Sequence, residues 1–328
     1  MKRILLVALC AVGIVEVSAQ QDPQFTQNMF NRLATNPGYA GAKDVSLCAT
    51  LISREQWLGF EGNPRTNVFS AHKGFVVRQK HQMGGGLTII QDEIGPINSL
   101  NIKGALSYHY RISQGILSGG IEFGIFNQSI NGEWRAPEGN LDGTDDPSIP
   151  NSEAGATKLD LGFGLYYYTK DLYVGLSSTH LNQPLIEESL GDNSSLTFQQ
   201  VRHYYVTAGY NYPLDIGSAS LELQPSIFAK TDAVSTVVDI NTNVLYNNLL
   251  WAGVSYRTQD AVSFLAGVKF ETIVKYPELK PLSIGFAYDY NLSDLSDYND
   301  GSLEFMINYC YKFIKPVKLE RYKDVRFL

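Results

Sequence analysis

Residues 97–110, INSLNIKGALSYHY, alternate between apolar and polar side chains along their whole length. A period of two is typical of a β-strand with one apolar face and one polar face. In a soluble sandwich the apolar face points to the core, whereas in a membrane barrel it points to lipid and the polar face lines the lumen. The choice between these two architectures depends on the rest of the chain.

The composition favours a membrane barrel over a helical membrane protein. Charged residues make up 18% of the 328 residues, below the roughly 25% usual for soluble domains. After Val15 no apolar run approaches the roughly 18 residues that a spanning helix needs. Any later membrane-spanning element must therefore be a strand, in which polar residues alternate with apolar ones.

The first 19 residues have the features of a secretory signal peptide. Lys2 and Arg3 precede the apolar run 4–15, and small residues at 17–19 predict cleavage after Ala19. An uncleaved helical anchor is the alternative. Removing Lys2, Arg3 and Glu16 from the 26 basic and 33 acidic residues leaves 24 and 32, which argues against nucleic acid as a partner.

From about residue 44 to residue 313 the chain reads as an antiparallel all-β domain of about fourteen strands. The expected strands are 44–57, 66–77, 83–91, 97–110, 116–128, 157–169, 172–179, 201–211, 219–230, 236–246, 249–257, 262–270, 282–290 and 303–313. A soluble sandwich or propeller is the alternative, but no repeat of 40 to 50 residues supports a propeller.

The connections between these strands alternate in length. Three are short: 169–171, 213–217 and 247–248; three are long and polar: 129–156, 181–200 and 291–302. If the first strand rises from the periplasm, the long connections all lie outside and the short ones inside, as in outer-membrane barrels. Connections 271–281 and 258–261 depart from this pattern. We therefore expect a closed transmembrane barrel in the outer membrane, with the basic tail 314–328 in the periplasm.

The barrel interpretation assigns faces to individual residues. The polar residues expected to face the lumen are Lys103, His109, Arg111, Glu122 and Asp160. The aromatic residues expected at the membrane interfaces are Trp57, Tyr110, Tyr167, Tyr210, Tyr212, Tyr246, Trp251, Tyr288 and Tyr290. The apolar face of 303–313 ends at Phe313 and resembles the C-terminal strand signal of such barrels.

No stretch of the sequence indicates an enzyme, a cofactor site or a metal site. The usual hydrolase, metalloprotease and redox motifs are missing. His72, His109 and His203 fall within strands, where a hydrogen bond in the lumen is expected rather than a metal. The acidic stretches 142–146 and 294–300 could bind Ca²⁺ but do not have EF-hand spacing, so solvated loops are expected. The three glycines 84–86 are expected to allow close packing of a bent strand.

Two segments look specialised for binding. Residues 21–41, QDPQFTQNMFNRLATNPGYAG, do not alternate and precede the first strand, so they could plug the lumen from the periplasmic side; a flexible tail is the alternative. Residues 54–64, REQWLGFEGNP, place aromatic side chains on the first outer connection, as in a binding loop. The contacts expected from these segments are Phe25, Met29, Phe30, Asn36, Pro37, Tyr39, Arg54, Gln56, Trp57 and Phe60.

The two cysteines of the mature chain are expected to meet. Cys48 lies near the start of the first strand and Cys310 near the end of the last, both on the lumen face and both towards the periplasm. In a closed barrel these two strands are neighbours because closure leaves no edge. Neighbouring strands bring Cα atoms close enough for a disulfide, although two small residues filling the wall would also fit.

Several motifs resemble the PorP/SprF family of the type IX secretion system. They are residues 21–41, REQWLGFEGNPRT at 54–66, LQPSIFAK at 223–230, DIN at 239–241, WAGVSYRTQDA at 251–261 and GSLEF at 301–305. The resemblance implies an outer-membrane barrel that works with protein export. Some members are paired with a large secreted adhesin that carries a C-terminal targeting domain, and others associate with periplasmic components of the secretion ring.

From this resemblance we expect a non-enzymatic barrel that receives or anchors an exported surface protein, such as a gliding-motility adhesin. Its expected partners are that adhesin or its targeting domain, periplasmic secretion components and outer-membrane lipid. Two alternatives remain open: a channel for small hydrophobic or polar substrates, and a structural subunit of the secretion ring.

Overall fold

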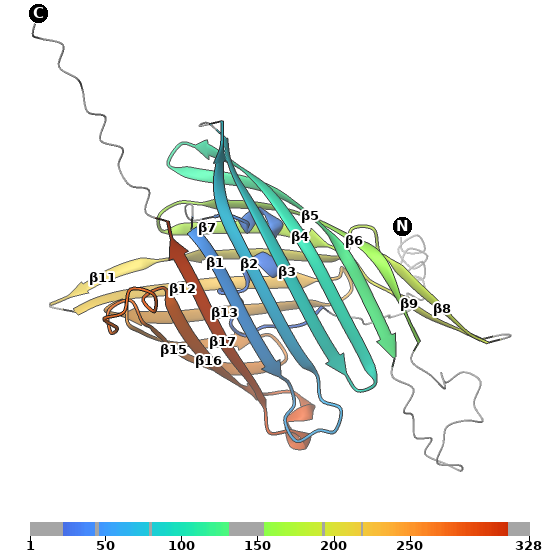
Figure 1. The fold of residues 1–328 in the computed structure, drawn as a ribbon. Helices are drawn as coiled ribbons and strands as arrows, with labels where there is room; N and C mark the ends of the chain where they lie inside the picture. The colour runs from blue at the N-terminus through green and yellow to red at the C-terminus, as the bar shows by residue number, and fades with distance from the viewer. Residues whose placement is uncertain are drawn as a thin grey trace, which may run out of the picture.

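A computed structural model describes residues 22–42, 46–78, 81–130, 154–191, 194–217 and 219–313. Most of these residues form one antiparallel sheet (Figure 1). Its strands are β1 (Ser46–Glu55), β2 (Arg65–Val77), β3 (His81–Ile94), β4 (Ile97–Ile112), β5 (Gly115–Ile130), β6 (Ala154–Tyr168), β7 (Leu172–Thr179), β10 (His203–Tyr210), β11 (Tyr212–Ile216), β12 (Ala219–Thr231), β13 (Thr236–Tyr246), β14 (Leu250–Arg257), β15 (Ala261–Lys269), β16 (Leu282–Asn291) and β17 (Ser302–Lys312).

The sheet closes into a barrel. β1 pairs with β17 over Ser46–Glu55, so the first and last strands are neighbours. β10 and β11 are consecutive parts of one wall strand, because both pair with β12 and only Asn211 separates them. Counting them together gives fourteen strands around the barrel, which confirms the expected all-β, closed, fourteen-stranded fold.

The barrel is apolar outside and polar inside, which answers the question posed by residues 97–110. On β4 the side chains of Leu106 and Tyr110 are 45% and 62% exposed, whereas Lys103 and Ser107 are each 3% exposed. The same alternation runs along β5, where Ile121 is exposed and Glu122 is buried. This is the arrangement of a barrel that faces lipid. No helix in the described part of the chain is long and apolar enough to cross a membrane.

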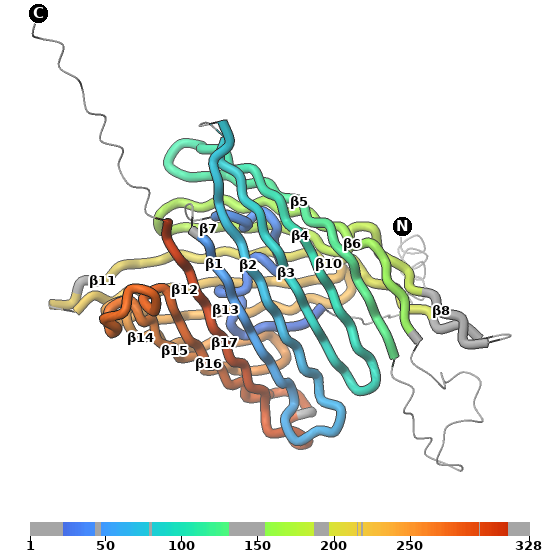
Figure 2. The backbone as a smooth tube through the Cα atoms, viewed as in Figure 1, coloured from blue at the N-terminus to red at the C-terminus, as the bar shows by residue number. Residues whose placement is uncertain are grey.

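The connections between strands differ from expectation at one place. Residues 181–200 were expected to form an irregular loop, but within them β8 (Leu185–Gly191) and β9 (Ser194–Gln199) pair as a separate hairpin. Figure 1 shows this hairpin extending beyond the wall of the barrel. Figure 2 shows the backbones of β1 and β17 running side by side in that wall. We refer to the end with this hairpin, which also holds the β1–β2 and β16–β17 connections, as the long-loop end, and to the end where β1 begins as the tail end.

Residues 22–42 lie inside the barrel and are called here the inner segment (Figure 1). The inner segment contains a turn at 26–30, a short helix α2 (Arg32–Thr35) and a 3₁₀ turn η1 (Pro37–Tyr39). Its first residues contact wall residues at the long-loop end, such as Lys230, and its last residues contact His72 in the tail-end half. The inner segment therefore runs along the lumen from one end towards the other, rather than closing it from the periplasmic side alone.

Glycines on the wall let the backbone of the inner segment approach closely. A Cβ at Gly120 would lie 2.4 Å from the carbonyl carbon of Pro37, and one at Gly84 would lie 2.0 Å from the oxygen of Ala40. At Gly86 a Cβ would lie 3.0 Å from the side chain of Leu33. Contact with the inner segment thus accounts for glycine at 84 and 86, where close packing of a bent strand was expected.

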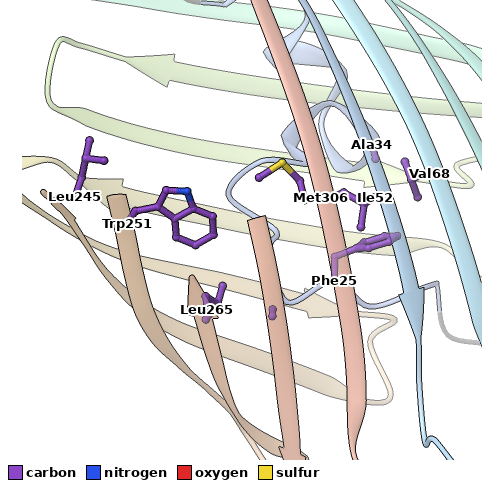
Figure 3. Packing of buried hydrophobic residues seen from close by; sticks show 9 residues of the cluster. Phe25, Ala34, Ile52, Val68, Leu245, Trp251, Leu265 and Met306 are labelled. Carbon is purple, nitrogen blue, oxygen red and sulfur yellow. The ribbon is translucent and has the colours of Figure 1, made fainter. Parts of the chain in front are cut away.

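An apolar cluster also lies inside the barrel (Figure 3). Phe25 of the inner segment packs in it with wall residues Ile52, Val68, Leu245, Trp251, Leu265, Ala287 and Met306. Trp251 is only 4% exposed and its ring centroid lies 5.2 Å from that of Phe30. The expected place of Trp251 at a membrane interface is therefore wrong: the alternation of β14 turns its side chain into the lumen, as it does that of Arg257.

Candidate functional site

The contacts between the inner segment and the barrel wall form the candidate site. Thr26 is fully buried beside two carboxylates of the last two strands. Its hydroxyl donates to Asp289 Oδ1 at 2.7 Å, and its backbone N–H donates to Glu304 Oε2 at 2.8 Å. The N–H of Gln27 donates to Glu304 Oε1 at 2.7 Å. One carboxylate thus accepts two successive backbone N–H groups.

Two arginines complete this cluster. Arg54 Nη2 lies 2.7 Å from Asp289 Oδ2, and Arg54 Nη1 donates to Thr26 Oγ1 at 2.9 Å and lies 3.3 Å from Glu304 Oε2. On the other side, Arg257 Nη1 lies 3.3 Å from Asp289 Oδ2.

Arg257 extends the cluster to two further carboxylates. Its Nε lies 2.8 Å from Asp239 Oδ1, and its Nη1 lies 3.2 Å from Asp260 Oδ2. Buried charges are tolerated where each has partners of opposite charge and hydrogen bonds. The cluster therefore joins β1, β13, β14, β16 and β17 to one threonine of the inner segment.

This cluster was not expected from the sequence. Arg54 was expected on the β1–β2 connection, but it is the second-last residue of β1 and its side chain is 1% exposed inside the barrel. The alternation of β1 gave the signal, since Arg54 shares the face of Thr50. The cluster draws Thr26, Arg54, Asp239, Arg257 and Glu304 from separate motifs of the sequence, and long-range pairing alone brings them together.

A second cluster holds the first described residue, Asp22. The two nitrogens of His180 lie 3.0 Å from Asp22 Oδ1 and from Asp160 Oδ1. The hydroxyl of Tyr205 also donates to Asp22, and Lys230 Nζ donates to the Asp22 backbone oxygen at 2.6 Å. The two carboxylates thus hold the His180 ring between them.

Four of the five polar residues expected in the lumen are buried there, and one is not. Lys103 Nζ lies 3.1 Å from Glu122 Oε1 and also donates to the backbone oxygen of Ala34 at 3.4 Å. Asp160 belongs to the second cluster, and His109 Nε2 lies 2.9 Å from the Ala40 oxygen. Arg111 is exposed instead, because it lies at the tail-end rim of β4.

The later part of the inner segment is held mainly by hydrogen bonds between a side chain and a backbone group. Asn36 Nδ2 donates to the backbone oxygen of Leu165 at 3.0 Å, and Asn36 Oδ1 accepts from Gly38 at 2.8 Å. Ser118 donates to the Gly38 oxygen at 2.6 Å. His72 accepts from the Gly41 N–H at 3.1 Å. These contacts give His72 and His109 hydrogen bonds in the lumen.

Aromatic side chains of the wall and of the inner segment itself surround Arg32. Its guanidinium carbon lies 3.9 Å from the ring centroid of Tyr173 and 5.7 Å from that of Tyr39, and its Nη1 donates to the Tyr166 hydroxyl at 3.3 Å. Cation–π contacts of this kind gain strength away from water. Of the predicted contacts of this segment, Phe25, Asn36 and Pro37 are buried, while Met29, Phe30 and Tyr39 are partly buried.

The predicted binding loop between β1 and β2 is ordered by its own backbone contacts. The N–H of Gln56 donates to the Pro64 oxygen, and the N–H of Leu58 donates to the Gly301 oxygen of the neighbouring connection. Phe60 is 52% exposed, whereas Trp57 is half-buried with a positive φ of 52°. Of the two aromatic residues expected to be exposed, Phe60 is the one that presents most of its side chain.

Cys48 and Cys310 are direct partners across the β1–β17 seam. Their Cα atoms are 4.1 Å apart and the sulfur atoms form a disulfide. The bond lies on the lumen side of the tail-end half, where both cysteines line a chamber.

The inner segment separates two chambers in the lumen. The outer chamber, of about 140 Å³, is bordered by Phe25 and Ala34 and lies between the segment and β3, β4 and β5 at the long-loop end. The inner chamber, of about 510 Å³, is bordered by Met29, Phe30 and Leu33 and lies towards the tail end. Residues from the middle of the segment therefore lie between the two spaces.

Within the described ranges, no group of three or more His, Cys, Asp or Glu side chains is placed to hold a metal ion. The acidic stretch 142–146 lies outside the described residues. In the stretch 294–300 a 3₁₀ turn, η2 (Asp294–Tyr298), carries the carboxylates along an exposed connection.

A family model for the type IX secretion system membrane protein PorP/SprF matches residues 17–309. The chain belongs to this family. The match spans both the inner segment and nearly all of the barrel, so the buried clusters described above lie within the family's own region. The protein is thus a β-barrel membrane protein of the type IX secretion system, located in the outer membrane.

Comparison with curated proteins finds no match. Among solved structures, the chain is similar to the translocator domain of the autotransporter NalP from Neisseria meningitidis, with 13% identity, a TM-score of 0.42, and coverage of 82% of this chain and 88% of that one. It is also similar to the CymD monoaromatic hydrocarbon channel, with 12% identity, a TM-score of 0.46, and coverage of 87% and 93%. Similarity this low bears on none of the functional conclusions below.

Proposed function

We propose that this family member is a closed, non-enzymatic anchor in the outer membrane that holds an exported surface protein, a motility adhesin, at its long-loop end. The observation that carries the proposal is the inner segment, which is tied to five strands through Thr26 and occupies the lumen. A channel for solutes would need this segment to leave, and Asp289 and Glu304 would then lose the hydrogen bonds that they accept from Thr26 and Gln27.

An exposed aromatic residue at the long-loop end supports the proposal that the surface protein binds there. Phe60 presents an exposed aromatic side chain on an ordered connection, as in surfaces that bind other proteins. The tail 314–328 follows β17 at the opposite end, where contact with periplasmic secretion components is proposed. The two ends of the barrel would then serve different partners.

Affinity purification from outer membranes tests the proposal. Wild-type protein should retain a large surface protein, and the variant Trp57→Ser/Phe60→Ser should lose most of it. Tyr276→Ser is the matched control, because Tyr276 is an aromatic residue 69% exposed on the β15–β16 connection at the other end. Equal retention by all three proteins would contradict the assigned surface.

Conductance separates the anchor from the channel. Purified wild-type protein in a planar bilayer should remain closed. A variant lacking residues 22–41 should conduct if it still forms a barrel, as judged by its gel mobility before and after heating. Steady conductance by the wild type, without loss of the segment, would favour the channel.

A further inference from the structure

The outer chamber has the features of a binding site for one small group. Its walls come from the lumen faces of β3, β4 and β5, from the inner segment, and from His180, Gln200 and Tyr205 near β7 and on β10. Phe25, Ala34, Ile90 and Phe126 supply apolar surface, and Ile94 and Ile97 lie at the β3–β4 turn of the long-loop end. The chamber is therefore closed by the segment on one side and lies next to the exterior on the other.

The volume of the outer chamber limits the size of a ligand that can bind there. Its volume of about 140 Å³ is close to that of an apolar cavity of roughly 150 Å³ that holds one benzene ring. A single six-membered ring therefore fits, and a larger fused system would have to extend out of the chamber.

Two buried acceptors without hydrogen-bond partners favour a ligand that carries a hydrogen-bond donor. Gln128 and Asn101 are 2% and 6% exposed, and within the described residues neither Gln128 Oε1 nor Asn101 Oδ1 has a hydrogen-bond partner. Asn101 Nδ2 donates to Asp160 Oδ2 at 3.1 Å, so its oxygen is the free end. Buried acceptors without partners are costly, and a ligand that carries a donor would satisfy them.

The charges around the chamber disfavour an anionic ligand. Lys103 pairs with Glu122, and His180 lies between Asp22 and Asp160. Asp92 accepts a hydrogen bond from the Thr66 hydroxyl. Lys103 and His180 are thus both paired with carboxylates, so neither is free to balance an anionic ligand.

We propose that the outer chamber binds a neutral aromatic ring that bears a hydroxyl donor, that is, a phenol. The ring comes either from a free phenolic compound or from a tyrosine side chain of an exported protein. The tyrosine source rests on the proposed function, since it requires a polypeptide at the long-loop end. The hydroxyl donates to Gln128 or Asn101, and the ring packs on Phe25 and Phe126.

Binding can be measured on the intact barrel in nanodiscs by calorimetry. The probes are phenol and the peptides N-acetyl-Gly-Tyr-Gly-amide and N-acetyl-Gly-Phe-Gly-amide, which differ by one hydroxyl. We expect the tyrosine peptide to bind about tenfold more tightly than the phenylalanine peptide, the effect of one buried hydrogen bond. Binding of phenol without the tyrosine peptide would support the chamber and assign it to free compounds.

Two variants and a control make the site specific. Gln128→Leu should bring the two peptides to within about twofold of each other, and Ser99→Phe, which fills the chamber from β4, should abolish binding of both. Asn243→Leu is the control, because Asn243 is equally buried with a free oxygen but lines the inner chamber. The proposal is overturned if neither phenol nor the tyrosine peptide binds, if both peptides bind alike to the wild type, or if Asn243→Leu has the same effect as Gln128→Leu.

This experiment is independent of the anchor proposal. It uses purified barrel and defined probes, so a missing surface protein in the affinity purification leaves its result unchanged. Conversely, a barrel that binds no phenol could still retain a surface protein through Phe60.

Discussion

At the scale of single residues, Lys103 and Glu122 are charged side chains of the lumen that are buried against each other rather than exposed to water. Their side chains are 4% and 2% exposed, and the lysine also holds the inner segment through the Ala34 oxygen. The alternation of β4 and β5 predicted which way both residues point. It did not predict their pairing, because a strand pattern carries no information about what fills the barrel.

This pairing leads to a first prediction. Lys103→Met should lower the free energy of unfolding by about 3–5 kcal/mol, because it leaves Glu122 buried without a partner, while Lys103→Met with Glu122→Leu should cost much less. On the lipid face, Leu106→Arg near the middle of β4 should cost roughly 2–4 kcal/mol. Urea unfolding in lipid vesicles measures the free energy of unfolding of all three variants. If the single variant Lys103→Met and the double variant lost the same free energy of unfolding, the unpaired Glu122 would not be the cause of the destabilisation.

The second prediction concerns two neighbouring glycines of β5. Gly120→Ala should destabilise the barrel by about 1–3 kcal/mol, because its Cβ would overlap the Pro37 backbone. Gly119→Ala is the control, since its Cβ would make an ordinary contact of 3.6 Å with Leu165 on the outer face. Thermal unfolding and proteolysis of the inner segment should both separate the two variants. Similar behaviour would mean that residues 36–38 do not seat against β5.

At the scale of elements, the strands were largely predictable, whereas the contacts of the inner segment were not. Period-two alternation located the wall strands because each one separates lipid from lumen over its whole length. The inner segment has no such pattern, since its environment is the lumen itself and its partners come from many strands. The apolar cluster around Phe25 was missed for the same reason, as was the place of Trp251.

The seam between β1 and β17 provides the third prediction. The disulfide joins cysteines 262 residues apart, so the double variant Cys48→Ser/Cys310→Ser should be less stable by about 2–4 kcal/mol. The variant should still form a barrel, because the strands on either side of the bond remain paired. Urea unfolding measures the difference in stability, and heated gel samples with and without reductant test the bond: reduced wild type should match the variant, whereas unreduced wild type should migrate differently because its chain is cross-linked. A wild type indifferent to reductant would remove the covalent bond and leave the seam.

At the scale of the whole molecule, the fourth prediction concerns orientation. We expect an epitope tag within 129–156 to be labelled on intact cells and a tag within 315–328 to be labelled only after the outer membrane is opened. The parity of the strands places these two positions at opposite ends of the barrel. Labelling of the tail but not of the loop would reverse the orientation and move the outer chamber to the periplasm.

Fold, closure and family could be anticipated for the molecule as a whole, whereas the buried clusters could not. The motifs at 54–66, 239–241, 251–261 and 301–305 are far apart in sequence and meet only when the barrel closes. Each contributes a charged residue, and a charge on a lumen face has no assignable partner until the register of the strands is known. Only the pairing of β1 with β17 brings Arg54 opposite Glu304.

The position of Glu304 has a consequence for biogenesis. This carboxylate holds the N–H groups of Thr26 and Gln27, which precede every strand of the barrel, yet it belongs to β17, the last strand to be synthesised. A polypeptide that stops short of β17 lacks both this carboxylate and the neighbour of β1. The start of the chain can thus be secured only after its end has arrived, so capture of residues 26 and 27 would report that translation and insertion are complete.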